Sequence, residues 1–184
     1  PQRVNLHLDG RFALGLDLET LLEKKLEVGQ EISEERFQKL VELSTQKKLW
    51  EKALKFLSFR PRSEKEVKNF LIKKKADEEE IGWALGKLKE KGYLNDEEFA
   101  RWWVEQRKTF RPKGWRVLKM ELRQKGVPED TIAKLLNCYI AGGLEGELAK
   151  KVLEKKLESL EHLPLQKLKQ KLGNHLARRG FDWE

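Results

Sequence analysis

Two short basic turns carry the residues best suited to bind an anion. They are Phe59-Arg60-Pro61-Arg62-Ser63 and Phe110-Arg111-Pro112-Lys113-Gly114. Each turn is predicted to precede a helix, where free backbone N–H groups and added cations favour a phosphate or a carboxylate. Because the charge recurs, we predict a binding role for Arg60, Arg62, Arg111, Lys113 and the neighbouring Arg116. The alternative is that each turn only stops a helix and its arginines pair with nearby glutamates.

Two tryptophans next to arginines extend these candidate sites. Helical spacing places Phe99, Trp103 and Phe110 on one core stripe and leaves Trp102 on the flank of the same helix. An exposed tryptophan beside an arginine can stack on a base or anchor in a protein pocket. For Trp102 and Trp115, packing between neighbouring units is the open alternative.

Further cations lie at predicted helix ends. Lys74 belongs to a run of three lysines, and Arg178 and Arg179 end a later helix. The helix dipole favours cations at such ends even without a partner, so a binding role and a structural role stay equally open.

Catalytic and metal-binding patterns are missing from the sequence. The histidines His7, His162 and His175 lie in separate predicted elements, outside any metal-ligand spacing, and no glycine-rich phosphate loop occurs. The acidic runs at 77–80 and 96–98 lie at predicted helix starts, where carboxylates favour the dipole. We therefore predict no catalytic residue, metal or cofactor, and a protein that is not an enzyme.

The charge of the chain is uneven. The 184 residues carry a net charge of +8, and residues 99–141 alone hold 10 Lys/Arg against 4 Asp/Glu. A basic face of this kind indicates nucleic acid or an acidic protein surface as partner, although a solvated Lys/Glu-rich exterior is the alternative. No apolar run approaches the roughly 18 residues of a membrane span, and no signal peptide opens the chain, which predicts a soluble, cytoplasmic protein. The single Cys138 excludes an internal disulfide and is predicted to be a buried core thiol.

The N-terminal residues predict a β-hairpin, because apolar and polar residues alternate around Asp9-Gly10. We favour a three-residue loop with Gly10 in a left-handed bulge, which pairs Leu6 with Phe12 and Val4 with Leu14 on one face. A two-residue loop would place the apolar residues of the two strands on opposite faces.

Helices follow the hairpin. Asp17 is predicted to cap a helix that ends near Gly29, and Ser33 to cap a second one. A further helix runs from about Gln46 to Phe59, where the next proline disfavours helix.

The chain then repeats itself. The two basic turns match at an offset of 51 residues, and Leu172, Leu176, Gly180 and Phe181 match the second copy at an offset of 54. Each copy is predicted to be three helices that stack on their neighbours. The predicted fold is mainly α, with three tandem three-helix repeats in an elongated array. The predicted domains are an N-terminal β-hairpin with short helices at 1–48 and repeats at 49–94, 95–141 and 144–184, the last helix being missing or truncated.

One stretch joins the first repeat to the second. Gly92 is predicted to close one helix, and Asn95 or Asp96 to cap the next. The chain here resembles the RecX family of bacterial recombination regulators. The resemblance rests on residues 59–64 (FRPRSE), 92–100 (GYLNDEEFA), Gly114, 121–122 (EL), 125–127 (KGV) and 178–181 (RRGF).

The resemblance implies a modular helical protein that binds the RecA filament on single-stranded DNA. Such a protein suppresses RecA ATPase, strand exchange and filament stability in recombination, DNA repair and the SOS response, and it does so as a monomer without catalysis. DNA, single-stranded or duplex, would be contacted through phosphates. The chain departs from the family pattern at Asn95, where aspartate is usual, and at Lys75, where the repeat places glycine. The alternative function is a direct DNA-binding protein with helix-turn-helix-like units.

Overall fold

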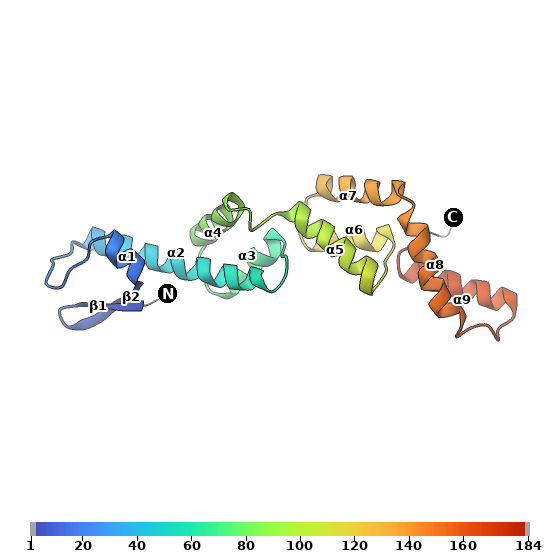
Figure 1. The fold of residues 1–184 in the computed structure, drawn as a ribbon, viewed down its shortest axis with the longest axis horizontal. Coiled ribbons are helices and arrows are strands. Elements are labelled where there is room, and N and C mark those ends of the chain that lie inside the picture. Colours follow the sequence, from blue (N-terminus) through green and yellow to red (C-terminus); the bar gives the residue numbers. More distant parts are fainter. Residues whose placement is uncertain (1–2, 183–184) are drawn as a thin grey trace.

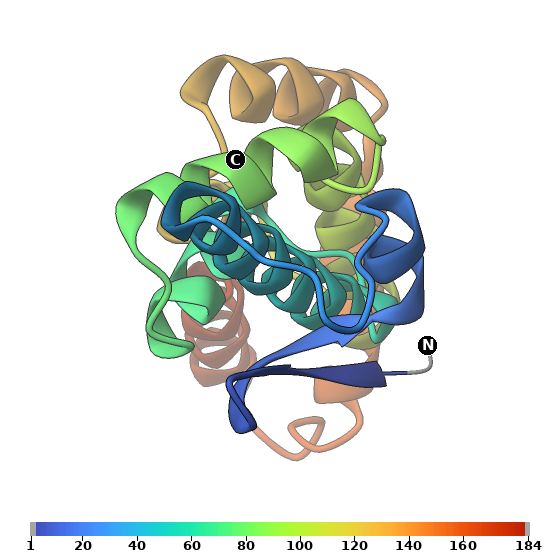
Figure 2. The ribbon, with the colours of Figure 1, turned by 90° about the vertical axis from the view of Figure 1, so that its left-hand side faces the viewer.

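The computed structural model describes residues 3–182 and shows an elongated, mainly helical chain with a small β-hairpin at one end (Figure 1). Within this range the elements follow in the order β1 (Arg3–Leu8), β2 (Arg11–Asp17), α1 (Leu18–Glu23), α2 (Glu34–Ser58), α3 (Glu64–Lys73), α4 (Glu78–Glu90), α5 (Asp96–Phe110), α6 (Trp115–Gln124), α7 (Glu129–Ala141), α8 (Leu144–Leu157) and α9 (Leu165–Arg178). Viewed along the long axis from the hairpin end, the helices stand one group behind another (Figure 2). This is the predicted array of helical repeats behind a hairpin.

The hairpin turns through Asp9 and Gly10 alone, so the predicted three-residue loop is wrong. Both residues have positive φ, of 49° and 77°, and Leu8 pairs with Arg11 across the turn. Two central residues with positive φ give the backbone twist that a tight two-residue hairpin turn requires.

A β-bulge restores the apolar face that the two-residue turn would otherwise disrupt. The register shifts after the turn, with Ala13 as the extra residue of β2. Leu6 therefore pairs with Leu14 and Val4 with Leu16, and both pairs place apolar side chains on the face toward the helices.

The first helix is shorter than predicted. Asp17 caps α1 as expected, accepting a hydrogen bond of 2.9 Å from the Thr20 backbone N–H. The helix ends at Glu23 rather than near Gly29, because Lys25 takes a left-handed conformation with φ of 46°.

The helix predicted to begin at Ser33 and the one predicted from about Gln46 to Phe59 are one continuous helix. Ser33 caps α2, which runs unbroken for 25 residues. Ser44 lies in the stretch that was expected to break the helix, but it is buried, and its hydroxyl donates a 3.0 Å hydrogen bond to the Gly15 carbonyl of the hairpin. A buried polar side chain with a partner therefore ties the middle of α2 to β2.

The helices after the hairpin form three units: unit 1 (the second half of α2 with α3 and α4), unit 2 (α5–α7) and unit 3 (α8 and α9). The described part of the chain contains three hydrophobic clusters. The first joins the hairpin to α2, and the second fills unit 1. The third runs through units 2 and 3 without interruption, from Phe99 to Phe181. Any third helix of unit 3 would fall beyond Asp182, outside the described residues.

The link from unit 1 to unit 2 has the predicted form. Gly92 ends α4 with φ of 70°, and Asn95 caps α5 by accepting hydrogen bonds from the backbone N–H groups of Glu97 and Glu98.

Asp77 caps α4 in a reciprocal pair with Glu80, so the acidic run at 77–80 stabilises the start of that helix.

Two predictions about single side chains are wrong. Cys138 is exposed rather than buried, because α7 turns Ile132, Leu136 and Tyr139 inward and leaves Cys138 on its outer face. Phe110 is 73% exposed rather than part of the core stripe, since it is the last residue of α5 and extends past the packed helices.

Candidate binding surface at the joints between the units

Both basic turns lie where one unit meets the next. We call the contact between units 1 and 2 joint 1–2, and that between units 2 and 3 joint 2–3. In joint 1–2 the Ser63 hydroxyl donates a 2.7 Å hydrogen bond to the Lys125 carbonyl. In joint 2–3 the backbone N–H of Gly114 donates a 2.9 Å hydrogen bond to the Arg179 carbonyl. Because Ser63 and Gly114 are repeat equivalents, as are Lys125 and Arg179, the same contact is made twice.

A second contact also recurs in the two joints. The backbone N–H of Glu64 donates to Oδ1 of Asp96 at 2.8 Å, and that of Trp115 donates to Oε1 of Glu145 at 3.2 Å. Each acceptor belongs to the first helix of the following unit. Burial raises the pKa of both Asp96 and Glu145, and the hydrogen bond from the backbone works against that rise. These carboxylates satisfy free N–H groups at a helix start, which is a structural role.

The cations of joint 1–2 are bound within the protein. Arg60 donates to both carboxylate oxygens of Glu66, at 3.0 and 2.9 Å, and Lys125 of the next unit donates to the same carboxylate at 2.6 Å. Burial acts to raise the pKa of Glu66, but the hydrogen bonds from Arg60 and Lys125 outweigh it and lower that pKa. For Arg60 the structure favours the structural alternative.

Arg62 also faces the protein. Its guanidinium lies 4.1 Å from the centre of the Phe56 ring, and its Nε is buried with no hydrogen-bond partner in the described part of the chain. Burial lowers the pKa of Arg62, and the nearby charge of Arg60 acts in the same direction. A guanidinium held on an aromatic face keeps only its outer N–H groups for a partner.

The two candidate tryptophans are half-buried in the two joints. The Trp102 ring packs 6.1 Å from that of Phe99, and the Arg60 guanidinium lies 5.6 Å from its centre. Trp115 lies in joint 2–3, with the Arg116 guanidinium 5.6 Å from its ring centre. Trp102 therefore packs against the core of unit 2 and faces Arg60 of unit 1, and the backbone N–H of Trp115 contacts Glu145 of unit 3.

The cations of joint 2–3 are less engaged. Arg111 is exposed and Lys113 half-exposed, and within residues 3–182 neither is paired with a carboxylate. Arg116 pairs with Asp182 at 3.0 Å, and the Arg179 guanidinium points to the Pro112 carbonyl at 3.5 Å. The structure thus gathers Arg111, Lys113, Arg116, Trp115 and Arg179 around joint 2–3.

Two predicted residues lie outside the joint contacts. Lys74 ends α3, at the opposite end from Ser63, and its ammonium lies 5.5 Å from the centre of the Phe70 ring. Arg178 ends α9 on the exposed side, where its Nε donates to the Asn174 carbonyl. Both positions agree with cations that stabilise a helix end.

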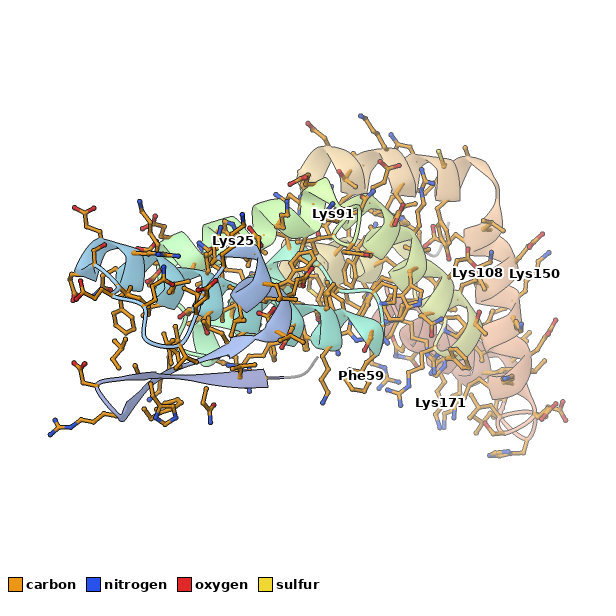
Figure 3. The ribbon with its side chains drawn as sticks, turned by 60° about the vertical axis from the view of Figure 1, so that its left-hand side comes forward. Lys25, Phe59, Lys91, Lys108, Lys150 and Lys171 are labelled. Carbon is orange, nitrogen blue, oxygen red and sulfur yellow. The ribbon has the colours of Figure 1, made fainter. Side chains whose placement is uncertain are left out.

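The structure adds exposed residues that sequence reasoning did not select. Phe59 and Phe110, at equivalent places in the two turns, are 74% and 73% exposed, and Phe59 extends past the end of α2 (Figure 3). Lys151, Lys155, Lys156 and His175 line a pocket beside Phe110. The sequence signal for these residues was the phenylalanine before each Arg-Pro pair and the lysine pairs one helical turn apart in α8.

Within the described residues, no cluster of three or more His, Cys, Asp or Glu side chains is arranged to hold a metal ion. Over the same residues, no helix combines the length and apolar character needed to cross a membrane. The architecture is that of a helical-repeat protein whose joints carry exposed cations and aromatic rings.

Comparison with known proteins identifies the family. The chain matches the RecX family models at residues 50–88 (first three-helix domain), 95–136 (second three-helix domain) and 145–184 (third three-helix domain). The regulatory protein RecX of Bacillus subtilis (strain 168) is 35% identical over 183 residues, which cover 100% of this chain and 69% of that protein. The RecX of Geobacillus sp. (strain WCH70) is 36% identical over 188 residues, with the same coverage. The chain belongs to the RecX family of regulatory proteins.

Solved structures agree with this assignment. A crystal structure of regulatory protein RecX superposes with a TM-score of 0.77 at 27% identity, covering 98% of this chain and 88% of the other. RecX from Lactobacillus salivarius gives a TM-score of 0.68 at 26% identity, covering 76% of this chain and 90% of the other.

Proposed function

We propose that this protein binds the RecA filament on single-stranded DNA and mainly inhibits its ATPase, strand exchange and stability. It would act in recombination, DNA repair and the SOS response as a soluble cytoplasmic monomer without catalytic activity. Membership of a family of regulatory proteins supports a regulatory role. The domain boundaries at 1–48, 49–94, 95–141 and 144–184 belong to the same proposal.

The observation that carries the proposal is the recurrence of one joint between successive units. Two hydrogen-bonding contacts occur in both joints. In the first, Ser63 donates to the Lys125 carbonyl and Gly114 to the Arg179 carbonyl. In the second, the first backbone N–H of α3 and that of α6 each donate to a carboxylate in the first helix of the next unit. A repeated contact sets each unit at a regular interval from the last, which gives the elongated molecule of Figure 1. Such a molecule suits a partner that is itself a long helical assembly.

Joint 2–3 supplies the charges for this contact. Arg111 and Lys113 extend from the turn between α5 and α6 without a carboxylate partner in residues 3–182. Free cations next to a helix start can bind the phosphates of DNA or acidic side chains of a protein. The bound cations of joint 1–2, by contrast, mainly hold units 1 and 2 together.

The test is the DNA-stimulated ATPase of RecA, measured with increasing amounts of this protein. We expect inhibition by the wild type and weaker inhibition by the double variant Arg111→Ala/Lys113→Ala. The variant should keep its helicity and melting temperature, because exposed charges contribute little to stability. The matched control is Lys134→Ala/Lys150→Ala, which removes the same charge from exposed positions on α7 and α8.

Equal inhibition by the wild type and by Arg111→Ala/Lys113→Ala would make the turn structural. An excess of wild-type protein that leaves RecA ATPase and strand exchange unchanged would contradict the proposal as a whole. In that case, tight binding to naked duplex DNA with a salt slope of about 0.9 per phosphate contact would favour the direct DNA-binding alternative.

A further inference from the structure

A pocket at joint 2–3 has only cationic charges in its lining. It has a volume of about 310 Å³ and lies between the end of α5, the second half of α8 and the end of α9. Its charged and titratable residues are Lys151, Lys155, Lys156, His175 and Arg179, and no carboxylate of the described chain lines it.

The cations are placed by helical spacing. Lys151 and Lys155 lie one turn apart on α8, and Arg179, the residue that follows α9, lies one turn after His175. None of the three lysines is paired with a carboxylate within residues 3–182, although α8 also carries glutamates. The pocket thus has three unpaired lysines from α8, together with His175 of α9 and Arg179, whose guanidinium also reaches the Pro112 carbonyl.

The electrostatics at His175 agree with this picture. Burial lowers the pKa of His175, and the charges of Arg179, Lys156 and Arg178 lower it further. Every charge that acts on this imidazole is positive, and Lys151 and Lys155 line the same pocket. The pocket is therefore a region of positive potential, which favours an anionic ligand.

An exposed aromatic ring stands at the same pocket. Phe110 is 73% exposed, and its neighbours in the lining include Thr109 and Pro112. Several large apolar side chains of the described chain are exposed, and Phe110 differs from them in lining a pocket together with unpaired lysines. A flat ring next to ammonium groups is the arrangement that holds a base by stacking and its phosphate by charge.

The equivalent position in joint 1–2 lacks this combination. Phe59 is as exposed as Phe110 and lines a larger pocket of about 790 Å³. There the cation of the turn, Arg60, is held by Glu66, and a carboxylate, Glu98, lies in the pocket lining. Of the two joints, as described within residues 3–182, joint 2–3 alone combines an exposed ring with unpaired lysines.

We propose that this pocket binds one nucleotide of a single-stranded nucleic acid, with the phosphate between the lysines of α8 and Arg179 and the base stacked on Phe110. A volume near 300 Å³ is at the lower end for small-molecule pockets and suits one nucleotide. A duplex keeps its bases stacked and paired, so it cannot offer this ligand. The proposal rests on the proposed function and deepens it, because it assigns the DNA contact of the regulator to joint 2–3.

The test is direct binding of a fluorescent oligo(dT) to the purified chain, without RecA. Lys151→Glu should weaken binding and lower the salt slope by about 0.7, the loss of one phosphate contact. Phe110→Ala should weaken binding by about 5- to 150-fold, which is the effect of losing one stacked base. Bound phosphate should also raise the pKa of His175, which the NMR shift of its ring protons follows.

Two matched controls come from the chain. Lys150→Glu makes the same charge change one residue away, at an exposed position outside the pocket lining, and Figure 3 shows Lys150 on the outer side of α8. Phe59→Ala removes the equivalent ring of joint 1–2. Both should bind oligo(dT) as the wild type does.

Nucleotide binding in this pocket would be contradicted by equal losses in Lys151→Glu and Lys150→Glu, by undiminished binding of an abasic oligonucleotide, or by equal competition from polyglutamate. The last would assign the pocket to an acidic peptide. If Phe110→Ala binds oligo(dT) normally and still inhibits RecA, nucleotide binding in the pocket is contradicted and the proposed function stays intact. Wild-type protein that binds oligo(dT) as expected but leaves RecA ATPase unchanged would contradict the proposed function and leave nucleotide binding in the pocket intact.

Discussion

Lys75 shows the cost of a residue that departs from its own repeat. It lies just after α3 with φ of 63°, the left-handed conformation that Gly126 and Gly180 take after α6 and α9, with φ of 83° and 80°. Glycine adopts this conformation freely, whereas a residue with a Cβ costs on the order of 1–2 kcal/mol, because Cβ then lies too close to the following carbonyl oxygen. The lysine is exposed, so its side chain gains little packing in return.

Lys75→Gly should therefore stabilise the protein by about 1 kcal/mol, measured by urea unfolding. The control Lys73→Gly, two residues earlier in the last turn of α3, should destabilise it by about 1 kcal/mol, because glycine is a poor helix former. A loss of stability in both variants would mean that the lysine at position 75 makes a stabilising contact.

At the scale of elements, a charge fixes the hairpin and α1 to α2. The Lys47 ammonium of α2 lies 2.6 Å from Oδ1 of Asp17 and 2.8 Å from Oε2 of Glu19. Burial acts to raise the pKa of Asp17, but hydrogen bonds from Lys47 and Thr20 outweigh it and hold that pKa well below its usual range. The Lys47 pKa is raised, chiefly by its hydrogen bond to Asp17.

A lowered carboxylate pKa gives stability that is present above the unfolded pKa of about 4 and is lost as pH falls toward the folded value. Asp17→Asn keeps the helix cap and removes the charge. We expect it to cost about 1 kcal/mol at neutral pH and progressively less than that below about pH 4. Urea unfolding across this pH range measures the difference from the wild type.

The control for this prediction is Glu19→Gln, which removes the other partner of Lys47. The Glu19 side chain is 83% exposed and that of Asp17 only 11%, so Glu19→Gln should change stability by a few tenths of a kcal/mol. Unchanged stability of Asp17→Asn at neutral pH would show that the cap, not the charge, is what α1 needs.

At the scale of the whole molecule, equivalent residues of the two joints make their contact through different groups. The hydroxyl of Ser63 reaches the Lys125 carbonyl in joint 1–2, whereas in joint 2–3 the backbone of Gly114 itself approaches the backbone of Gly180. A Cβ at Gly114 would lie 2.0 Å from the Gly180 carbonyl oxygen. Its φ of −72° is ordinary, so glycine is required there by close approach and not by backbone conformation.

Gly114→Ala should force units 2 and 3 apart and cost about 1–3 kcal/mol, because neither backbone can yield as a side chain would. Urea unfolding measures the loss, and small-angle scattering measures the changed shape. The control is Gly86→Ala on the exposed side of α4, where a Cβ meets nothing within 4 Å and should stabilise the helix by about 1 kcal/mol. Unchanged stability and shape in Gly114→Ala would contradict the tight joint.

The repeat, the helix caps at Asp17 and Ser33 and the family could be predicted from the sequence, because these depend on local patterns of residue type and spacing. The Arg-Pro turns follow from residue type, and the repeat aligns Lys75 with glycines that take the same left-handed conformation. The sequence left the cap of α5 open between Asn95 and Asp96, and the structure has Asn95. The register of the hairpin could not be predicted from the sequence. It depends on a bulge at Ala13, which places the apolar side chains of both strands on the face that packs against α2. The continuity of α2 could not be predicted either, because Ser44 in its middle is hydrogen-bonded to the hairpin.

The residue types of the candidate site could be predicted from the sequence, but which of the two turns has unpaired cations could not. The turns at Arg60 and Arg111 are equivalent in sequence, and only the tertiary structure separates them. Arg60 meets Glu66, a carboxylate at a position where the second unit has Val117, and Lys125 joins the same carboxylate from the next unit. Arg111 has no such partner in the described chain, because an ion pair depends on which side chains the packing of units brings within reach.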